Sequence, residues 1–473
     1  MTDPLWSQSE LTEAFGAPPS APLNAPVQGV SIDTRTLAPG DLFFAILGEA
    51  SDGHDYVARA FAAGASACVV ARGKRGELAA HGPVFAVDDT LRAMERLGIA
   101  ARARTRARIV AVTGSVGKTS AKEMLRVALG AAGPTHASAA SYNNHWGVPL
   151  TLARMPASAA FGVFEIGMNH AGEITPLVAM VRPHVALVTT IAPVHIEYLG
   201  SIEAIAEAKA EIFTGVEPGG TIVINRDAPQ FALLEKRAML ARRKALTFGA
   251  DARADGRLLH FEAAGDGAVV RASIHGREIS FRLGAPGLHM AQNAIGVLLA
   301  AVALDADLDR AAAALGEFSA QKGRGARLTL HGADGPFTLI DESYNANPAS
   351  MRAALALLGA TSPGAGGRRV AVLGDMLELG AGGMQAHAEL AGDLIRHHVD
   401  LLFCAGPLMR ALFDAAPPAM RGAWAERSAD IHEAVFDAAR GGDVLMVKGS
   451  NGSAMGPVVA ALRSHFSLAP AGE

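Results

Sequence analysis

The sequence is poor in several features that mark particular classes of protein. Of its 473 residues only 2 are cysteines, and Cys68 and Cys404 each lie inside an apolar run ("ACVVA" and "LLFCAG"). We therefore expect two reduced core residues rather than a disulfide framework or a metal site. The formal net charge is only −4, which offers no basis for a nucleic-acid surface.

Long apolar segments are also missing. The longest helix-like run, "AIGVLLAAVAL", is too short to span a bilayer. The N-terminal "MTDPLWSQSE" has no basic region followed by an apolar core, so we expect no signal peptide. These absences predict a cytoplasmic protein without membrane insertion, and we expect it to act as a monomer.

What the sequence does contain is enough apolar material for several cores. Hydrophobic residues make up 50% of the chain, and its length predicts about three domains. Apolar strand-like runs alternate with alanine-rich helical patterns, which predicts α/β domains with parallel-rich sheets. We place the domains at residues 1–104, 105–320 and 321–473. The basic run "ARARTRARI" at the first boundary is interpreted as a solvated connector, and the glycine-rich "QKGRGARL" at the second as a hinge.

The strongest chemical signal is "IVAVTGSVGKTSAKEML", in which a strand-like run leads through a glycine-rich loop into a helix. Gly114 and Gly117 would let backbone N–H groups crowd a polyphosphate, and the helix N-terminus adds positive potential. Lys118 can neutralise phosphate oxygens, and Thr119 can offer its hydroxyl to Mg²⁺. Val112 stands where the usual phosphate-loop spacing has its first glycine. The pattern predicts nucleotide binding, with a plain strand-to-helix turn as the alternative.

Four more polar residues directly follow apolar strand-like runs. Glu165 follows "FGVF", His195 follows "VALVTTIAPV", Asp341 follows "FTLI" and Lys448 follows "DVLMV". Ligands bind at the carboxyl ends of strands in open parallel sheets, so such residues are candidates for a shared site. Taken singly, each has a structural alternative as a cap, a hydrogen-bonded core group or a solvated charge.

The stretch "SIEAIAEAKAEIFTGV", residues 201–216, predicts one amphipathic helix. Lys209 lies four residues after Ile205 and three before Ile212, so its side chain projects from the apolar stripe. Periodicity alone favours a lysine that lays its methylenes along the core and brings its ammonium to water.

Together these motifs resemble the Mur ligases, the ATP-dependent amide-forming family of peptidoglycan precursor synthesis. The matching stretches include "SIDTRTLAPGDLFFAILGEASDGHDYVARAFAAGA", "TGSVGKTSAKEM", "SYNNHWGVPL", "EIGMNHAGEI", "DESYNANPASM", "VLGDMLELG" and "VKGSNGSAM". Within the family, "DESYNANP" is typical of the branch that joins D-alanyl-D-alanine to UDP-N-acetylmuramoyl-tripeptide. The resemblance implies an N-terminal domain for the uridine nucleotide, a central ATPase domain and a C-terminal Rossmann-like domain that closes on it.

The resemblance also implies roles for individual residues. For ATP it implies a phosphate loop of Gly114, Ser115, Val116, Gly117, Lys118, Thr119 and Ser120, with Asn293 beside adenine and Arg327 and Asp341 at the γ-phosphate and ribose. For Mg²⁺ it implies Thr119 and Glu165 at one ion, and His195 and Lys209, the latter as a CO₂-derived carbamate, at a second. Lys118, Glu165, His195, Lys209 and Arg327 would be catalytic. For the substrates it implies Ser31, Asp33, Thr34 and Arg35 at the uridine nucleotide, and Asn143, Asn144, Tyr344, Asn345, Asn347 and Lys448 near the peptides.

One departure concerns the turn before Asn293, where the family's histidine-asparagine pair reads His289 and Met290 here. Three alternatives stay open at this point: a sibling ligase that adds one amino acid, a folylpolyglutamate synthase, and a non-catalytic ATP-binding relative. The intact "DESYNANP" and the N-terminal nucleotide segment speak against the first two. The retained metal-ligand set speaks against the third.

Overall fold

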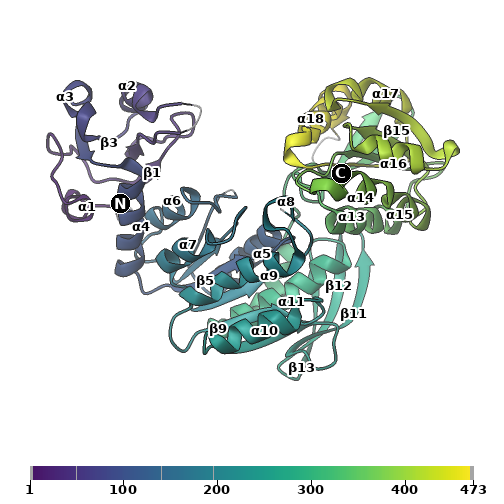
Figure 1. The fold of residues 1–473 in the computed structure, drawn as a ribbon, viewed down its shortest axis with the longest axis horizontal. Helices are drawn as coiled ribbons and strands as arrows, with labels where there is room; N and C mark the ends of the chain where they lie inside the picture. The colour runs from purple at the N-terminus through teal and green to yellow at the C-terminus, as the bar shows by residue number, and fades with distance from the viewer. Residues whose placement is uncertain (1–3, 49–50, 140, 195, 469–473) are drawn as a thin grey trace.

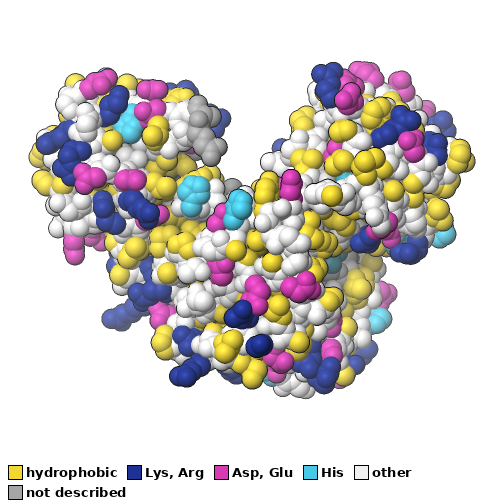
Figure 2. All heavy atoms as spheres, viewed as in Figure 1, with side chains coloured by type: hydrophobic (Ala, Val, Ile, Leu, Met, Phe, Trp, Pro, Cys, Tyr) yellow, Lys and Arg dark blue, Asp and Glu magenta, His cyan; other side chains and the backbone are white. Residues whose placement is uncertain are grey.

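The computed structural model describes residues 4–48, 51–139, 141–194 and 196–468. Its strands form three separate sheets that follow one another along the chain, which confirms the predicted three-domain α/β architecture. Figure 1 shows the N-terminal and C-terminal domains as two lobes on either side of the central domain. The space-filling view in Figure 2 shows a wide cleft between these two lobes.

The N-terminal domain is a four-stranded parallel sheet in the order β1-β2-β3-β4 with helices around it. Neighbouring residues of its strands point to opposite faces: Phe44 and Val69 belong to one buried core, and Phe43 and Cys68 to another. The elements are β1 (Gly29–Ser31), β2 (Asp41–Phe44), β3 (Ala67–Ala71), β4 (Val84–Val87), α1 (Gln8–Phe15), α2 (Val57–Ala62), α3 (Arg75–Leu78) and α4 (Thr90–Arg104).

The basic run at the end of this domain is not a solvated connector, so that interpretation is wrong. Helix α4 contains the first half of the run, up to Arg104, and packs against the central domain. Arg102 is buried and donates hydrogen bonds to the carbonyl oxygens of Val181 and Arg182, each at 2.8 Å. Arg104 lies 3.4 Å over the Trp6 ring. Arg102 therefore joins the N-terminal domain to the central domain, and Arg104 packs within the N-terminal domain. A one-dimensional charge pattern reveals neither partner.

The central domain has a nine-stranded sheet in the order β13-β12-β11-β10-β9-β8-β5-β7-β6. It is parallel from β6 to β11, and β11, β12 and β13 are antiparallel. The strands are β5 (Arg108–Thr113), β6 (Thr135–Ala137), β7 (Phe161–Glu165), β8 (Val185–Val188), β9 (Thr221–Asn225), β10 (Lys244–Gly249), β11 (Gly256–Ala264), β12 (Gly267–Ile274) and β13 (Arg277–Leu283). The helices are α5 (Lys118–Gly130), α6 (Gly147–Ala153), α7 (Ile174–Val181), α8 (Ile196–Leu199), α9 (Ile202–Ala210), α10 (Phe231–Leu240), α11 (Leu288–Ala303) and α12 (Leu308–Ala314).

Strands β5, β7, β8 and β9 of this sheet are buried on both faces, as a continuous apolar strand predicts. In β5, Val110 and Val112 pack into a core with α5 and α11, whereas Ile109 and Ala111 pack into a second core with α7 and α9. The predicted helix over residues 201–216 exists but is shorter in α form, because α9 gives way to a 3₁₀ turn over Glu211–Gly215.

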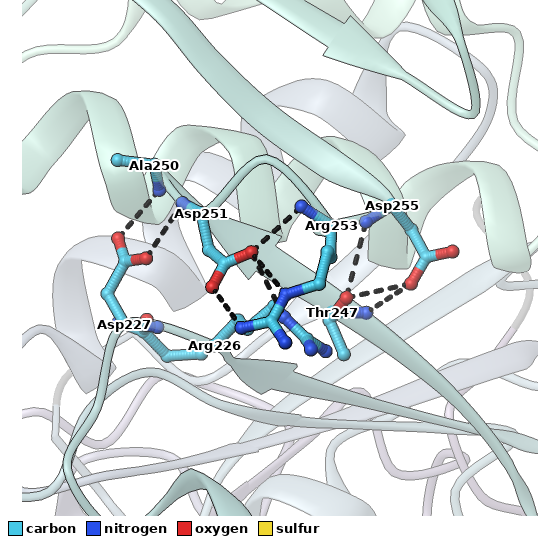
Figure 3. A network of polar contacts seen from close by, with 8 residues as sticks. Arg226, Asp227, Thr247, Ala250, Asp251, Arg253 and Asp255 are labelled. Atoms are coloured by element: carbon cyan, nitrogen blue, oxygen red, sulfur yellow. Dashed lines mark hydrogen bonds and ion pairs between the residues drawn. The ribbon is translucent and has the colours of Figure 1, made fainter.

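A polar network fixes the loops that follow β9 and β10 (Figure 3). Asp227 accepts hydrogen bonds from the backbone N–H groups of Ala250 (2.7 Å) and Asp251 (3.0 Å). Arg253 donates to the Asp251 carboxylate and thereby lowers the pKa of that carboxyl. Since Gln292 also reaches Asp227, the network steadies the first turns of α11.

The C-terminal domain is a seven-stranded sheet in the order β18-β17-β16-β19-β15-β14-β20, parallel from β18 to β15. The strands are β14 (Ala326–Gly332), β15 (Gly335–Glu342), β16 (Arg369–Gly374), β17 (Leu401–Ala405), β18 (Arg421–Ala425), β19 (Val444–Lys448) and β20 (Ser467–Leu468). The helices are α13 (Pro348–Ala360), α14 (Gly383–Ala388), α15 (Leu390–Arg396), α16 (Met409–Ala415), α17 (His432–Ala438) and α18 (Met455–His465).

Two expectations from composition can be compared with the fold. Cys68 and Cys404 are both buried and free, which confirms that they are core residues. Within the described ranges, no helix is both long and apolar enough to cross a membrane.

Candidate functional site

A cavity of about 380 Å³ lies where the central and C-terminal domains meet. The central domain contributes the phosphate loop, the end of β7 and the start of α11, and the C-terminal domain contributes the segments after β15 and β19. The predicted site residues that line it are Ser115, Val116, Gly117, Lys118, Thr119, Ser120, Asn143, Glu165, Asn293, Tyr344, Asn345, Asn347 and Lys448. The structure therefore brings together most of the residues that the motifs singled out.

The phosphate loop is held by hydrogen bonds to the chain beyond β8. The Ser115 backbone N–H donates to the carbonyl of Thr190 (2.8 Å), and the Thr189 hydroxyl donates to the carbonyl of Val116 (2.6 Å). Gly117 has a φ of 85° at the start of α5, and a Cβ there would lie 2.5 Å from the Asn293 amide nitrogen. Glycine therefore lets Asn293 approach the loop closely at the N-terminus of α5, where backbone N–H groups can bind a phosphate group.

Gly114→Ala is expected to weaken ATP binding by at least about tenfold. The added Cβ would lie 2.0 Å from the Thr189 hydroxyl, at a backbone φ of 149°, so the strained loop must move. Titration calorimetry with ATP measures the change. Gly130→Ala is the matched control, because Gly130 lies at the C-terminal end of α5, away from the loop, and a Cβ there meets nothing within 4 Å. Equal ATP affinity in both variants would contradict the assigned loop.

Next to the loop, a buried carboxylate is surrounded by neutral oxygen and amide groups. Glu165, at the end of β7, accepts a hydrogen bond from the Thr119 hydroxyl at 2.9 Å and from the Asn143 side-chain amide at 2.7 Å. Glu165 is only 2% exposed, and no cation of the described residues forms an ion pair with it. A buried carboxylate beside a hydroxyl is the kind of oxygen donor set that Mg²⁺ prefers, so these residues fit the predicted ion.

Lys118 turns back onto the loop that it follows. Its ammonium donates to the Gly114 carbonyl at 2.7 Å. Burial lowers the pKa of this amine, the carboxylate of Glu165 opposes the shift, and the positive charge of Arg324 adds to it. A phosphate group that displaces the carbonyl would give Lys118 the anionic partner that it lacks here.

Lys209 is buried on the apolar stripe of α9, with only 1% of its surface exposed. Its ammonium therefore does not reach bulk water, contrary to what the helical period alone favoured. Burial lowers the pKa of the Lys209 amine well below 10.5, and the charge of Lys118 lowers it further. Lys209 is not among the residues that line the cavity. No carboxylate of the described residues pairs with it.

His195, predicted as a ligand of the second ion, lies outside the described residues. Among the residues that the structure describes, no group of three or more His, Cys, Asp or Glu side chains is arranged to hold a metal ion. The second ion therefore stays a prediction.

Two predicted residues of the C-terminal domain lie outside the cavity lining. Arg327 donates to the Thr361 hydroxyl at 3.0 Å and pairs with Asp266 at 3.3 Å, which links β14 to the hairpin of the central sheet. The Asp341 carboxylate accepts from the Gly323 N–H at 2.9 Å and from Ser343, so it shapes the hinge.

The cavity instead contains an arginine that the motifs did not single out. Arg324 lies 4.0 Å over the Tyr344 ring and reaches the Ser141 hydroxyl at 3.4 Å, and that hydroxyl also lies 3.4 Å from Thr119. The run "QKGRGARL" offers two arginines: Arg324 lies between Gly323 (φ 75°) and Gly325 (φ 98°) and enters the site, whereas Arg327 lies in β14.

Some predicted substrate residues are engaged in local structure. Asn144 accepts from the Gly147 N–H at the start of α6, and Asn347 caps α13 by accepting from the Ser350 N–H. In the N-terminal domain, the buried Ser31 donates to the Asp33 carbonyl, and Arg35 forms an ion pair with the Asp33 carboxylate. Thr34 and these three residues are absent from the cavity lining, since they belong to the lobe across the cleft (Figure 1).

Lys448, at the end of β19, reaches into the same cavity from the C-terminal sheet. It is 2% exposed and donates to the Glu342 carboxylate (3.2 Å) and to the Asn345 carbonyl (3.0 Å). The hydrogen bond to Asn345 ties the segment after β15 to the end of β19, and Tyr344 and Asn345 of that segment line the cavity.

A buried histidine supports another wall of the cavity. The His387 ring accepts from the Met376 N–H (2.9 Å) and donates to the Gly383 carbonyl (2.6 Å), which anchors the segment that carries Leu377 and Glu378. Burial lowers the pKa of His387 below its ordinary 6.5, against opposing effects of Gly383 and Asp375.

We expect this histidine to make folding acid-sensitive. Because its pKa is lower in the folded chain, the unfolded chain binds more protons below pH 6.5, so stability is full above pH 6.5 and falls as the pH drops through the folded-state pKa. Thermal melts from pH 7.5 to 5 should show a smaller loss of stability for His387→Gln than for the parent. The slope of the unfolding free energy against pH should differ between the two by the equivalent of up to about one bound proton. His81→Gln, at an exposed site, should leave the slope unchanged.

Comparison with known proteins places this site in a family. Residues 112–301 match the Mur ligase middle domain, residues 326–451 the Mur ligase glutamate ligase domain, and residues 26–104 the Mur ligase family catalytic domain. The chain is 34% identical over 452 residues to the UDP-N-acetylmuramoyl-tripeptide--D-alanyl-D-alanine ligase of Escherichia coli, covering 94% of this chain and 97% of that protein. The ligase of the same name from Rickettsia prowazekii is 29% identical, with 96% and 99% covered.

Comparison with solved structures leads to the same family. A crystal structure of MurF from Acinetobacter baumannii matches with a TM-score of 0.83 and 28% identity, covering 97% of this chain and 98% of that one. MurF from Thermotoga maritima in complex with ADP shares the fold, with a TM-score of 0.74 at 21% identity. The resemblance that the motifs indicated is thus confirmed over the whole chain, which belongs to the Mur ligase family.

Proposed function

We propose that the chain is an ATP-dependent ligase that joins D-alanyl-D-alanine to UDP-N-acetylmuramoyl-tripeptide. The products are the UDP-N-acetylmuramoyl-pentapeptide precursor of peptidoglycan, ADP and phosphate. The observation that carries the proposal is the cavity, which brings the phosphate loop opposite Tyr344, Asn345 and Asn347 of the "DESYNANP" segment. The names of the full-length relatives support the choice of substrates.

The reaction needs an activated carboxylate, because an amine cannot expel oxide from it. Transfer of the γ-phosphoryl group of ATP to the terminal carboxylate of the tripeptide gives an acyl phosphate, with ADP released. The amine of D-alanyl-D-alanine then attacks the carbonyl carbon, phosphate leaves, and the nitrogen loses a proton. Positive charge must therefore gather where the triphosphate, the carboxylate and the developing oxyanion meet.

The chain's own residues supply much of that environment. Loop N–H groups at the start of α5 and the Lys118 ammonium would hold the β- and γ-phosphates, while Asn293 would lie beside adenine. Thr119 and Glu165 would hold one Mg²⁺, and His195 and Lys209 a second. When bound, Mg²⁺ would shield the negative charge of the phosphate oxygens during transfer.

For Lys209 to bind a cation, it must first become an anion. We propose that its amine, kept neutral by burial, takes up CO₂: the nitrogen bonds to carbon, a proton leaves, and a carbamate results. The carbamate oxygens on this long arm would suit a hard cation such as Mg²⁺.

The domains would share the work. The N-terminal domain (1–104), with Ser31, Asp33, Thr34 and Arg35, would bind the uridine nucleotide across the cleft from the cavity. The central domain (105–320) would bind ATP, and the C-terminal domain (321–473) would close on it when the ligands are bound. Small-angle scattering with an ATP analogue and both substrates should show a smaller radius of gyration than the free enzyme. We also propose that the enzyme acts as a cytoplasmic monomer.

An acceptor assay tests the function. Phosphate release from ATP is measured with UDP-N-acetylmuramoyl-tripeptide and either D-alanyl-D-alanine, D-alanine or L-lysine. We expect rapid release only with the dipeptide, together with a pentapeptide product in the mass spectrum. Equal release with a single amino acid would place the chain among the sibling ligases, and no release with any acceptor would favour a non-catalytic relative.

A further inference from the structure

The outer surface of helix α10 departs from the usual amphipathic plan. Leu234 and Ala238 are buried against the core. Lys236 follows Leu234 by two residues, and Leu240 follows Ala238 by two. Two residues are about 200° around the helix, so Lys236 and Leu240 point away from the protein. Met239 lies next to Leu240 on this outward face. A solvent face that ends in two large apolar side chains calls for an explanation, because a surface helix normally places polar residues there.

These two side chains are unusually exposed. Met239 is 70% and Leu240 63% accessible, and they are the only sequence neighbours among the exposed large hydrophobic residues of the described chain. A groove of about 420 Å³ begins beside Leu240, and its lining is mixed: Ala210, Phe213 and Ala241 are apolar, and Glu207, Glu211, Thr214, Arg237 and Arg243 are polar or charged. The protruding apolar surface is therefore that of Met239 and Leu240 themselves.

Positively charged residues precede and follow the apolar pair in the sequence. Five of the nine residues 236–244 are lysine or arginine, and none is acidic, although the whole chain carries a net charge of −4. Arg237 pairs with Glu207, and Arg243 donates to the Val216 carbonyl. The other three cations, Lys236, Arg242 and Lys244, are exposed and have no ion-pair partner among the described residues. We call Lys236, Met239, Leu240, Arg242 and Lys244 the α10 patch.

The position of the patch leaves the catalytic cleft free. In Figure 1, α10 lies along the lower edge of the central domain, beside α9 and away from the two lobes that flank the cleft. Figure 2 shows lysine, arginine and hydrophobic side chains over this lower region, with aspartate and glutamate side chains among them. A surface that contacts the patch therefore does not block the approach of substrates to the cavity.

We propose that the α10 patch docks the enzyme reversibly onto an anionic lipid surface. Met239 and Leu240 insert among the headgroups and upper acyl chains, and Lys236, Arg242 and Lys244 lie at the level of the phosphates. Charge complementarity selects this partner: the cations lack internal partners, and they flank protruding apolar side chains rather than line a recessed pocket that an acidic peptide would fill. Neither the apolar pair nor the three cations alone would bind the membrane firmly, but the two together would.

Vesicle flotation of the full-length enzyme tests the proposal. We expect it to float with phosphatidylcholine vesicles that contain phosphatidylglycerol, but not with phosphatidylcholine alone, and to dissociate at high salt. The triple variant K236Q/R242Q/K244Q should lower the partition coefficient on the order of a hundredfold. The double variant M239S/L240S should lower it by about tenfold or more.

Matched controls separate the patch from general charge and hydrophobicity. K74Q/R75Q/R96Q removes three exposed cations of the N-terminal domain, and Ile395→Ser removes an exposed apolar side chain of the C-terminal domain. Both should float like the parent, and all variants should keep the parent's melting temperature and its ligation rate in vesicle-free solution. A parent that stays unbound on both vesicle types, or patch variants that bind as well as the controls, would overturn the proposal and leave the patch to an acidic protein partner.

Discussion

Lys209→Ala is expected to abolish ligation, with kcat lowered on the order of a thousandfold or more. The variant loses the arm proposed to carry a carbamate to the second cation, while the buried stripe of α9 keeps its shape. The melting temperature should fall much less than the activity, because the change removes a buried amine whose pKa is already lowered by burial and by the charge of Lys118. Activity and thermal melting are measured on the same preparation, and near-parental ligation would refute the role.

Chemical rescue distinguishes a carbamate from an ammonium. Formate or acetate should restore part of the Lys209→Ala activity, since each supplies a carboxylate to the space that the carbamate would occupy. Methylamine, which supplies a cation, should restore none. Rescue by the amine alone would instead assign Lys209 as a charge-neutralising ammonium.

A second buried lysine provides the control for this experiment. Lys122 is, like Lys209, 1% exposed, but it pairs with Glu123 at 2.7 Å and donates to the Ser138 carbonyl. Its ammonium is therefore satisfied and has no reason to take up CO₂. Lys122→Ala should lower stability because it leaves Glu123 with one partner fewer, and no small carboxylate should repair it.

Local patterns were sufficient for the parts of the site that lie on single elements. The phosphate loop joins a buried strand to a helix N-terminus, and that signal is contained in about ten consecutive residues. Glu165 could be placed because carboxyl ends of parallel strands share one edge of a sheet. Lys209 could be placed on the buried stripe because helical period is a local property, although the depth of its burial depends on the neighbouring loop.

Contacts between distant segments were not predictable in the same way. The basic run at Arg102 and Arg104 has the composition of a solvated connector, yet those side chains find carbonyls of α7 and the ring of Trp6. Similarly, the family resemblance placed Asn144 and Asn347 near the peptides but did not reveal their local contacts. Asn144 accepts from the Gly147 N–H, and Asn347 caps α13 while it also lines the cavity. In each case the competing partner lies on another element or depends on backbone geometry.

The hinge arginines provide the second large expected effect. Arg324→Ala should lower kcat by about a hundredfold or more, because this guanidinium lies in the cavity beside Lys118 and next to the Ser141 hydroxyl that adjoins Thr119. Arg324→Lys should recover only part of the activity, since an ammonium cannot stack on the Tyr344 ring as a planar guanidinium does.

Arg327→Ala is the matched comparison, since the same charge is removed three residues away. Its guanidinium holds Thr361 and Asp266 rather than the cavity, so we expect kcat to change less than about fivefold and the melting temperature to fall slightly. The family resemblance implied that Arg327 lies at the γ-phosphate, and the two variants decide between the arginines. If Arg327→Ala proves the more damaging to kcat, the closed enzyme must exchange one arginine for the other, and the hinge at Gly325 would be the place where the chain turns to do so.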